Sequence, residues 1–134
     1  MRTIILDNEA VQAMWPDHRK HRAIAAHLVA VVARRRRGAD VKAVVPTTVR
    51  VEAGWNRTSP QASHANRFRV VDAPLDSATA NDAADIVRRV GVSVADAHVG
   101  AVARATTGDV VVLTSDPADV QRASAPKAVV TVRI

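Results

Sequence analysis

Five short runs of β-branched and other apolar residues alternate with longer helical segments along this chain. The runs predict strands at residues 3–6, 41–45, 69–73, 110–113 and 128–132. Helices are predicted between them, at residues 9–15, 18–37, 77–90, 93–107 and 117–124, with two shorter helices after residues 46 and 60. Strands separated by helices pair in parallel through right-handed crossovers. The alternation therefore predicts an α/β fold, a three-layer sandwich around a five-stranded parallel sheet.

Prolines and glycines mark the boundaries of these segments. Pro16 is expected to stop the first helix and Gly38 to end the second, because proline cannot continue a helix and glycine suits its carboxyl end. Thr47 or Thr48 is expected to cap the helix after the second strand, and Pro117 suits the first turn of the last helix. No repeat or long linker divides residues 1–134, so we expect a single domain.

The composition excludes several classes of protein. The chain has no cysteine, which excludes disulfides, thiolate metal sites and a cysteine nucleophile. The opening apolar run is too short for a signal-peptide core, and no stretch approaches the roughly 20 apolar residues that span a membrane. We therefore expect a cytoplasmic protein with no membrane segment.

The chain is strongly basic, with a formal net charge of +6 and a pI near 11.2. Such a charge favours polyanions, and nucleic acid is the usual one; an arginine-rich sequence can also reflect the base composition of a genome. Four consecutive arginines close the second predicted helix. One interpretation is that they suit the negative end of the helix dipole; the other is that they contact the RNA backbone. The candidate RNA contacts are Arg34, Arg35, Arg36 and Arg37, together with His18, Arg19 and Lys20.

Acidic residues occur where parallel strands end. Asp7 follows the first strand and Asp116 follows the fourth, while Asp96 and Glu52 lie in the first turns of helices that begin or pass near the same edge. Ligand sites in open parallel sheets form at this edge, where the strand order reverses. If strands one and four are neighbours, all four carboxylates can converge.

Such a convergence is unfavourable unless a cation joins it. Two carboxylates about 4 Å apart repel by roughly 4 kcal/mol at an effective dielectric of 20, and hard divalent cations bind oxygen ligands. Each aspartate taken alone is also well placed to be a helix cap. Glu52 is no cap, and it stands beside a presumed core face between Val51 and Ala53. The prediction of a metal site therefore depends on the set of four acids.

The set resembles the PIN domain, and most closely the VapC-type toxins of bacterial toxin–antitoxin pairs. The resemblance covers essentially the whole chain in motif order and spacing. It is carried by four segments: Ile5-Leu6-Asp7, Val49-Arg50-Val51-Glu52-Ala53, Val94-Ala95-Asp96-Ala97-His98, and Leu113-Thr114-Ser115-Asp116-Pro117-Ala118-Asp119-Val120.

The resemblance implies strand order 3-2-1-4-5 and an endoribonuclease that depends on Mg²⁺ or Mn²⁺ and hydrolyses RNA phosphodiester bonds with water activated at the metal. Asp7, Glu52, Asp96 and Asp116 match the metal-binding and catalytic acids. Thr114 matches a hydroxyl residue that orients Asp7, and Asn8 matches a position that contacts a phosphate or a water. Asp119 matches a further acid, secondary or structural. The implied partners are an RNA substrate, a cognate antitoxin protein and a second copy in a homodimer.

Two alternatives stay open. The first is a catalytically silent RNA- or protein-binding module on the same fold. The second is a receiver-like phosphoacceptor domain, which also has an acidic Mg²⁺ pocket on five parallel strands. A receiver needs an aspartate after strand three and a lysine after strand five, whereas Asp72 lies within the third predicted strand and Lys127 precedes the fifth.

Overall fold

The strands pair into one parallel sheet in the computed structural model, which describes all 134 residues. The strand order is β3-β2-β1-β4-β5, which confirms the predicted α/β class and order. Residue Leu6 of β1 stands opposite Leu113 of β4, so these two strands end side by side at the carboxyl edge of the sheet. The strands are β1 (Arg2–Leu6), β2 (Val41–Pro46), β3 (Val71–Ala73), β4 (Asp109–Thr114) and β5 (Val130–Arg133).

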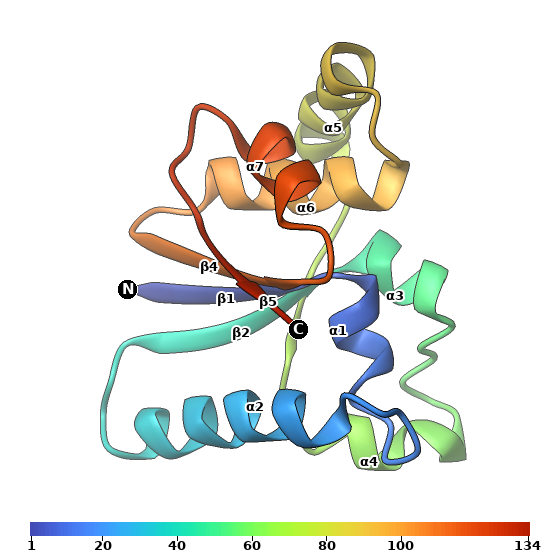
Figure 1. Ribbon diagram of the computed structural model, residues 1–134, viewed down its shortest axis with the longest axis vertical. Coiled ribbons are helices and arrows are strands. Elements are labelled where there is room, and N and C mark those ends of the chain that lie inside the picture. Colours follow the sequence, from blue (N-terminus) through green and yellow to red (C-terminus); the bar gives the residue numbers. More distant parts are fainter.

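Helices cover both faces of the sheet (Figure 1). Helices α2 and α4 lie across one face, while α6 and α7 cover the other and α5 packs outside them. Helices α1 and α3 stand at the carboxyl edge, where their strands β1 and β2 end. The helices are α1 (Asn8–Gln12), α2 (His21–Arg36), α3 (Thr47–Ala53), α4 (Ser63–Asn66), α5 (Ser77–Val90), α6 (Val94–Ala105) and α7 (Pro117–Ser124), with a 3₁₀ turn, η1 (Pro60–Ala62), before α4.

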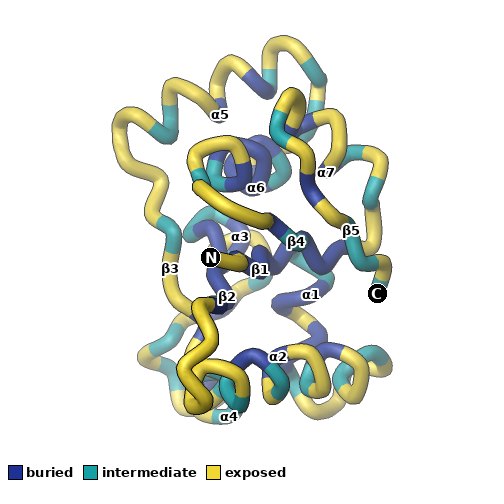
Figure 2. Tube along the Cα trace, turned by 90° about the vertical axis from the view of Figure 1, so that its left-hand side faces the viewer, coloured by how far each residue is buried: buried dark blue, intermediate teal, exposed yellow.

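The core is formed by the apolar strands together with the inner faces of the helices. The central strands β1 and β4 are buried on both faces, as their continuous apolar runs predict. Figure 2 shows the buried residues concentrated along the sheet and the inner faces of α2 and α6, with α5 largely exposed. A second, small cluster of mostly alanine side chains lies between α5, α6 and α7. Small residues there let α6 and α7 approach closely.

Several predicted boundaries were wrong at the carboxyl edge. Helix α1 ends at Gln12 and not at residue 15, since Trp15 precedes Pro16 and is biased away from helical backbone. Helix α2 begins at His21 and not at residue 18, because residues 16–20 form turns. Neither Thr47 nor Thr48 caps α3: the capping position is Pro46, without a side-chain cap.

None of the helices is long and apolar enough to cross a membrane.

Candidate active site

Asp7 stands at the junction of β1 and α1, where the chain leaves the sheet. Its carboxylate accepts a hydrogen bond from the backbone N–H of Ala10 at 3.1 Å and so caps α1. Its own N–H donates to the carbonyl of Leu113 at 3.2 Å, which extends the β1–β4 pairing by one residue. The residue is 8% exposed. The pairing of β1 with β4 therefore determines where this carboxylate lies.

Thr114 connects Asp7 to Asp116. The Thr114 side chain is fully buried at the end of β4, and its hydroxyl accepts the N–H of Asp116 at 2.9 Å. Hydrogen bonding from the Thr114 side chain and from the Ser115 backbone lowers the pKa of Asp7 and so offsets part of the effect of burial. One hydroxyl thus orients the carboxylate that follows β1 and the loop that carries the acid following β4.

Asp96 enters from α6, one turn into the helix. Ser93 is the capping residue of α6, and its hydroxyl oxygen accepts the Asp96 N–H at 3.1 Å. Hydrogen bonding from the Ser93 side chain lowers the pKa of Asp96 and so offsets part of the effect of burial. This hydrogen bonding holds the Asp96 side chain while leaving part of it exposed.

Asp116 and Asp119 share the first turn of α7. Asp116 caps the helix and accepts the N–H of Asp119 at 3.4 Å. The Asp119 carboxylate forms an ion pair with Arg122, three residues further along α7. Hydrogen bonding and charge from Arg122 hold the pKa of Asp119 below its ordinary value. Asp119 is therefore paired within its own helix, while its charge also acts on Asp96.

Asp7, Asp96 and Asp116 form an electrostatically coupled group, called here the acidic cluster. Burial raises the pKa of Asp7 and of Asp96 above the ordinary value, by removing water from the charged form. Neighbouring negative charge adds to the rise: Asp96 acts on Asp7, while Asp119 and Asp116 act on Asp96. The ionised cluster thus costs free energy in the absence of a cation.

Glu52 lies apart from the acidic cluster. It is exposed on α3, forms no hydrogen bond or ion pair, and is not among the charges that act on Asp7 or Asp96. The expectation of a core face beside it was wrong, since Val51 is 81% exposed. The buried face of α3 is marked instead by Val49.

A buried hydrogen bond joins α3 to α6. The hydroxyl of Thr48 lies 2.7 Å from Nδ1 of His98, whose side chain is fully buried. Burial lowers the pKa of His98, so the neutral imidazole is favoured, although the Pro74 carbonyl and Asp76 offset part of this effect. The bond ties the helix that carries Glu52 to the helix that carries Asp96. His98 therefore fills the core between the two helices.

The acidic cluster suits a hydrated divalent cation better than a closed protein cage. No group of three or more His, Asp or Glu side chains is close enough together to enclose a metal ion. Mg²⁺ is commonly bound by one or two carboxylates and keeps several waters and substrate oxygens as its other ligands. Carboxylates of raised pKa, held at one edge by Thr114 and Ser93, meet that requirement. Four acids converging on one ion were expected, but Glu52 is not among the charges that act on Asp7 or Asp96.

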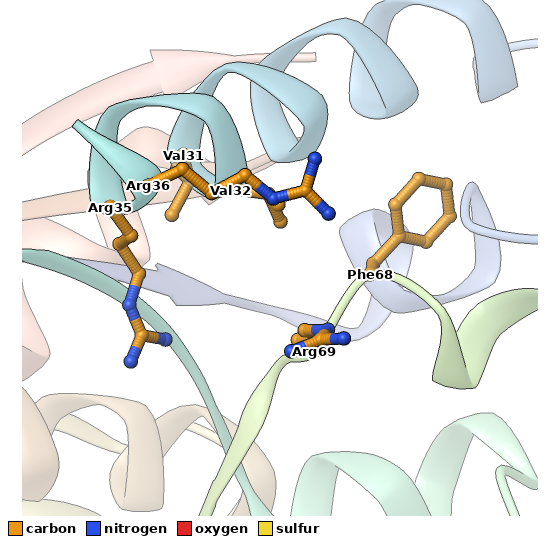
Figure 3. A pocket seen from close by; sticks show the side chains of 6 residues that line it. All are labelled: Val31, Val32, Arg35, Arg36, Phe68 and Arg69. Carbon is orange, nitrogen blue, oxygen red and sulfur yellow. The ribbon is translucent and has the colours of Figure 1, made fainter.

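The four arginines Arg34–Arg37 lie at the other edge of the sheet. They close α2 just before β2 begins, and Arg2 of β1 stands opposite Val41 of β2. The length of a five-residue strand, about 16 Å, separates this edge from Asp7. Arg35 and Arg36 line a pocket of about 260 Å³ between α2 and the start of β3, together with Val31, Val32, Phe68 and Arg69 (Figure 3).

The basic segment of residues 18–20 follows α1 and lies on the side of the carboxyl edge of the sheet. Glu9 of α1 lies 3.5 Å from His18 and 3.3 Å from Lys20, and Lys20 also donates to the carbonyl of Ile134 at 3.0 Å. Arg19 is exposed and makes no ion pair or hydrogen bond. Asn8, the first residue of α1, accepts a hydrogen bond from Gln12 at 3.1 Å.

Two residues of this edge were not predicted from the sequence. Ser93 holds Asp96, and its signal was present as a capping-box spacing three residues before an acid. Arg133 of β5 donates to the carbonyl of Ser115 at 3.1 Å and brings a cation beside the loop of Asp116. Arg133 had no sequence signal, because its place depends on the pairing of Thr114 with Arg133 across β4 and β5.

No protein-family model and no curated protein matches this chain.

Proposed function

We propose that this chain is a metal-dependent endoribonuclease of the PIN type. The observation that supports it is the acidic cluster: three carboxylates at the switch point of a 3-2-1-4-5 sheet, two of them with a raised pKa. Asp7 and Asp116 also cap helices, a role that an uncharged asparagine fills as well, so the gathered negative charge itself does not stabilise the fold. Their position beyond the carboxyl ends of β1 and β4 is where open parallel sheets bind ligands.

One or two of Asp7, Asp96 and Asp116 would hold Mg²⁺ or Mn²⁺, with waters and RNA oxygens as the other ligands. When bound, such a cation supplies a Lewis acid that lowers the pKa of water and neutralises charge on a phosphodiester. Thr114 orients the Asp7 carboxylate and positions the Asp116 loop. Asn8 follows Asp7 in sequence, and Arg133 donates to the carbonyl of Ser115, the residue before Asp116. Polar donors at these positions suit the phosphate oxygens of RNA.

Purified protein incubated with single-stranded and structured RNAs tests this proposal. We expect cleavage with Mg²⁺ or Mn²⁺ and none with EDTA. The Asp96→Asn variant should lose about a hundredfold or more in cleavage rate, since replacing even a residue that only contacts a metal ligand typically lowers activity about 10–100-fold. Asp85→Asn is the matched control, because Asp85 is an exposed, unpaired carboxylate of α5. Cleavage that survives both EDTA and Asp96→Asn would refute the metal mechanism.

The biological role we propose is that of a cytoplasmic toxin restrained by a cognate antitoxin, with homodimerisation as in the family that the sequence resembles. Expression in a bacterial host tests the role. Wild-type protein is expected to arrest growth, and Asp96→Asn to relieve the arrest while Asp85→Asn does not. Normal growth with the wild type at full expression would point to a ribonuclease with another role.

The second candidate is a catalytically silent RNA-binding module. The position of Glu52 favours it, because this acid stands exposed outside the acidic cluster. Under this alternative the wild type binds RNA with the same affinity in Mg²⁺ and EDTA and leaves it intact. The cleavage assay therefore separates the two candidates.

A further inference from the structure

An open groove of about 810 Å³ runs between the end of α1 and the end of α3, and neither the acidic cluster nor the fold accounts for it. One wall is formed by residues 12–19 and the other by residues 53–61. The lining residues that matter here are Gln12, Trp15, Arg19, Ala53, Ser59 and Gln61.

The groove begins at the acidic edge. Gln12 lines it and donates to the side chain of Asn8, the residue that follows Asp7. On the other wall Ala53 ends α3, the helix that packs against α1. A chain that places one phosphate at the acidic cluster can therefore continue into this groove.

The walls of the groove are held in place by contacts behind them. Trp15 is half-buried and packs at right angles to Trp55, with ring centroids 6.1 Å apart. Trp55 is 3% exposed and is itself covered by the guanidinium of Arg57, 4.1 Å from its ring centroid. Glu9 holds His18 and Lys20 on the first wall. The indole of Trp15 is thus presented to the groove at little further cost in conformational entropy.

The chemistry of the lining fits a nucleobase better than a phosphate. Most of the polar groups are neutral and can both donate and accept hydrogen bonds, and Gln61 has no partner for its amide. Asp17 is the one carboxylate in the lining. Arg19, two residues further along the chain, is unpaired. Bases of single-stranded RNA are recognised by stacking on aromatic rings and by hydrogen bonds to their edges. A single tryptophan suffices for one base, although the chain is poor in aromatic residues elsewhere.

We propose that this groove binds one base of single-stranded RNA beside the cleaved phosphodiester, stacked on Trp15 and read at its edge by Gln12 and Gln61, with Arg19 on the adjoining phosphate. The inference rests on the proposed function, because it takes RNA as the substrate. It adds to that function a site that selects which base stands next to the cleaved bond.

Binding measured without cleavage tests the groove separately from the catalytic proposal. Eight-nucleotide single-stranded RNAs of uridine, cytidine or adenosine, each with a fluorescent label, are titrated with protein in EDTA and followed by anisotropy. Tryptophan quenching by the unlabelled RNAs reports on Trp15 directly, since Trp55 is buried. We expect Trp15→Leu to weaken binding roughly 5- to 150-fold, the loss of one base stack.

Two exposed positions keep the test independent of folding. Gln61→Ala is expected to change the ratio of affinities among the three RNAs, because it removes an edge contact. Arg19→Gln is expected to weaken all three similarly and to lower the salt slope by about one. Arg89→Gln is the matched control, with the same loss of charge at an exposed position in the last turn of α5.

The outcomes separate the two proposals. If the wild type cleaves RNA but Trp15→Leu, Gln61→Ala and Arg19→Gln bind all three RNAs as the wild type does, the groove proposal is refuted and the nuclease stands. If the wild type binds RNA with these dependences but never cleaves it, the groove stands and the catalytic proposal fails. Quenching by an eight-residue polyglutamate peptide but not by RNA would also refute the groove proposal, in favour of an acidic protein partner.

Discussion

Asp7 combines a structural role with the metal-binding role proposed for it. It caps α1 through Ala10, and it is also the most buried carboxylate of the acidic cluster. A helix cap needs only an oxygen that accepts a hydrogen bond, which asparagine supplies as well as aspartate. The negative charge is therefore superfluous for folding. It is what a cation would require.

The Asp7→Asn variant is expected to unfold at a higher temperature than the wild type at pH 7 in EDTA, by a few degrees. The folded-state pKa of Asp7 lies above its ordinary value of 3.8. Ionising Asp7 therefore lowers the free energy of unfolding. This loss is absent below pH 3.8, grows as the pH rises from 3.8 through the raised pKa, and is complete above the raised pKa.

Thermal unfolding from pH 4 to pH 8 measures this effect, and the gap between the two proteins should shrink toward pH 4. Adding Mg²⁺ should raise the unfolding temperature of the wild type, because an ion that binds the folded state stabilises it. The unfolding temperature of the variant should not change, because the variant lacks the carboxylate that would bind the ion. An Asp7→Asn variant that is less stable than the wild type throughout would contradict the reading of Asp7 as a strained charge.

Thr114→Val is expected to lower RNA cleavage by about 10- to 100-fold, the usual effect of removing a partner of a metal-binding residue. The substitution removes the donor to Asp7 and the acceptor for the Asp116 N–H, while nearly preserving side-chain volume. Thr114→Ser, which keeps the hydroxyl, should recover most of the activity. Equal rates for the valine and serine variants would show that the hydroxyl does not position the site.

At the scale of elements, the approach of α6 to α7 is as important as the strand pairing. Gly100 of α6 lies against the backbone of α7: a Cβ added there would meet the Ala123 carbonyl oxygen at 2.5 Å. The first turn of α7 carries Asp116 and that of α6 carries Asp96. The distance between these helices therefore determines how the two acids face each other.

Gly100→Ala is expected to destabilise the protein by about 1–3 kcal/mol, the usual cost of overpacking a close contact. Helix propensity alone predicts the opposite sign, a gain of about 1 kcal/mol. Urea denaturation decides between the two, as a shift in midpoint at unchanged slope. Ala84→Gly on the exposed face of α5 measures the propensity effect by itself. A stabilised Gly100→Ala variant would mean that α7 moves away at little cost.

At the scale of the whole molecule, the positive charge is distributed over both edges of the sheet. The acidic cluster is at the carboxyl edge, with Arg133 beside the loop of Asp116, whereas Arg34–Arg37 lie at the amino edge. Exposed charges separated by more than a Debye length of about 10 Å in 0.1 M salt act weakly on each other. If RNA binds at the carboxyl edge as proposed, we expect the arginine run to act on it through the long-range field and not through contact.

Replacing Arg34, Arg35, Arg36 and Arg37 by glutamine lowers the net charge from +6 to +2, that is, 6 minus 4. We expect an unchanged kcat, with a KM for short RNA that rises at low salt and converges on the wild-type value at 0.15 M salt, where such charges are largely screened. Steady-state cleavage at several salt concentrations measures both. A fall in kcat, or a raised KM that persists at 0.15 M, would show direct contact with the substrate.

Local chemistry allowed much of this fold to be predicted from the sequence. The five apolar runs, Gly91 after α5 and Pro117 at the start of α7 indicate element types through backbone conformation and hydrophobic periodicity, which neighbours in sequence determine. Asp7 and Asp116 were predicted at strand ends for the same reason. The boundaries near Trp15 and Thr47 were wrong, because competing turns and packing decide them.

Only the tertiary structure decided how the functional groups face one another. The sequence by itself determined that four acids lie near strand or helix ends, since this depends on their own segments. Whether they meet depends on side-chain direction and on pairings across more than a hundred residues, such as Leu6 with Leu113. That pairing places Asp7 beside Thr114, while the orientation of α3 leaves Glu52 in solvent and, with α1, forms a groove lined by residues that no local pattern connects.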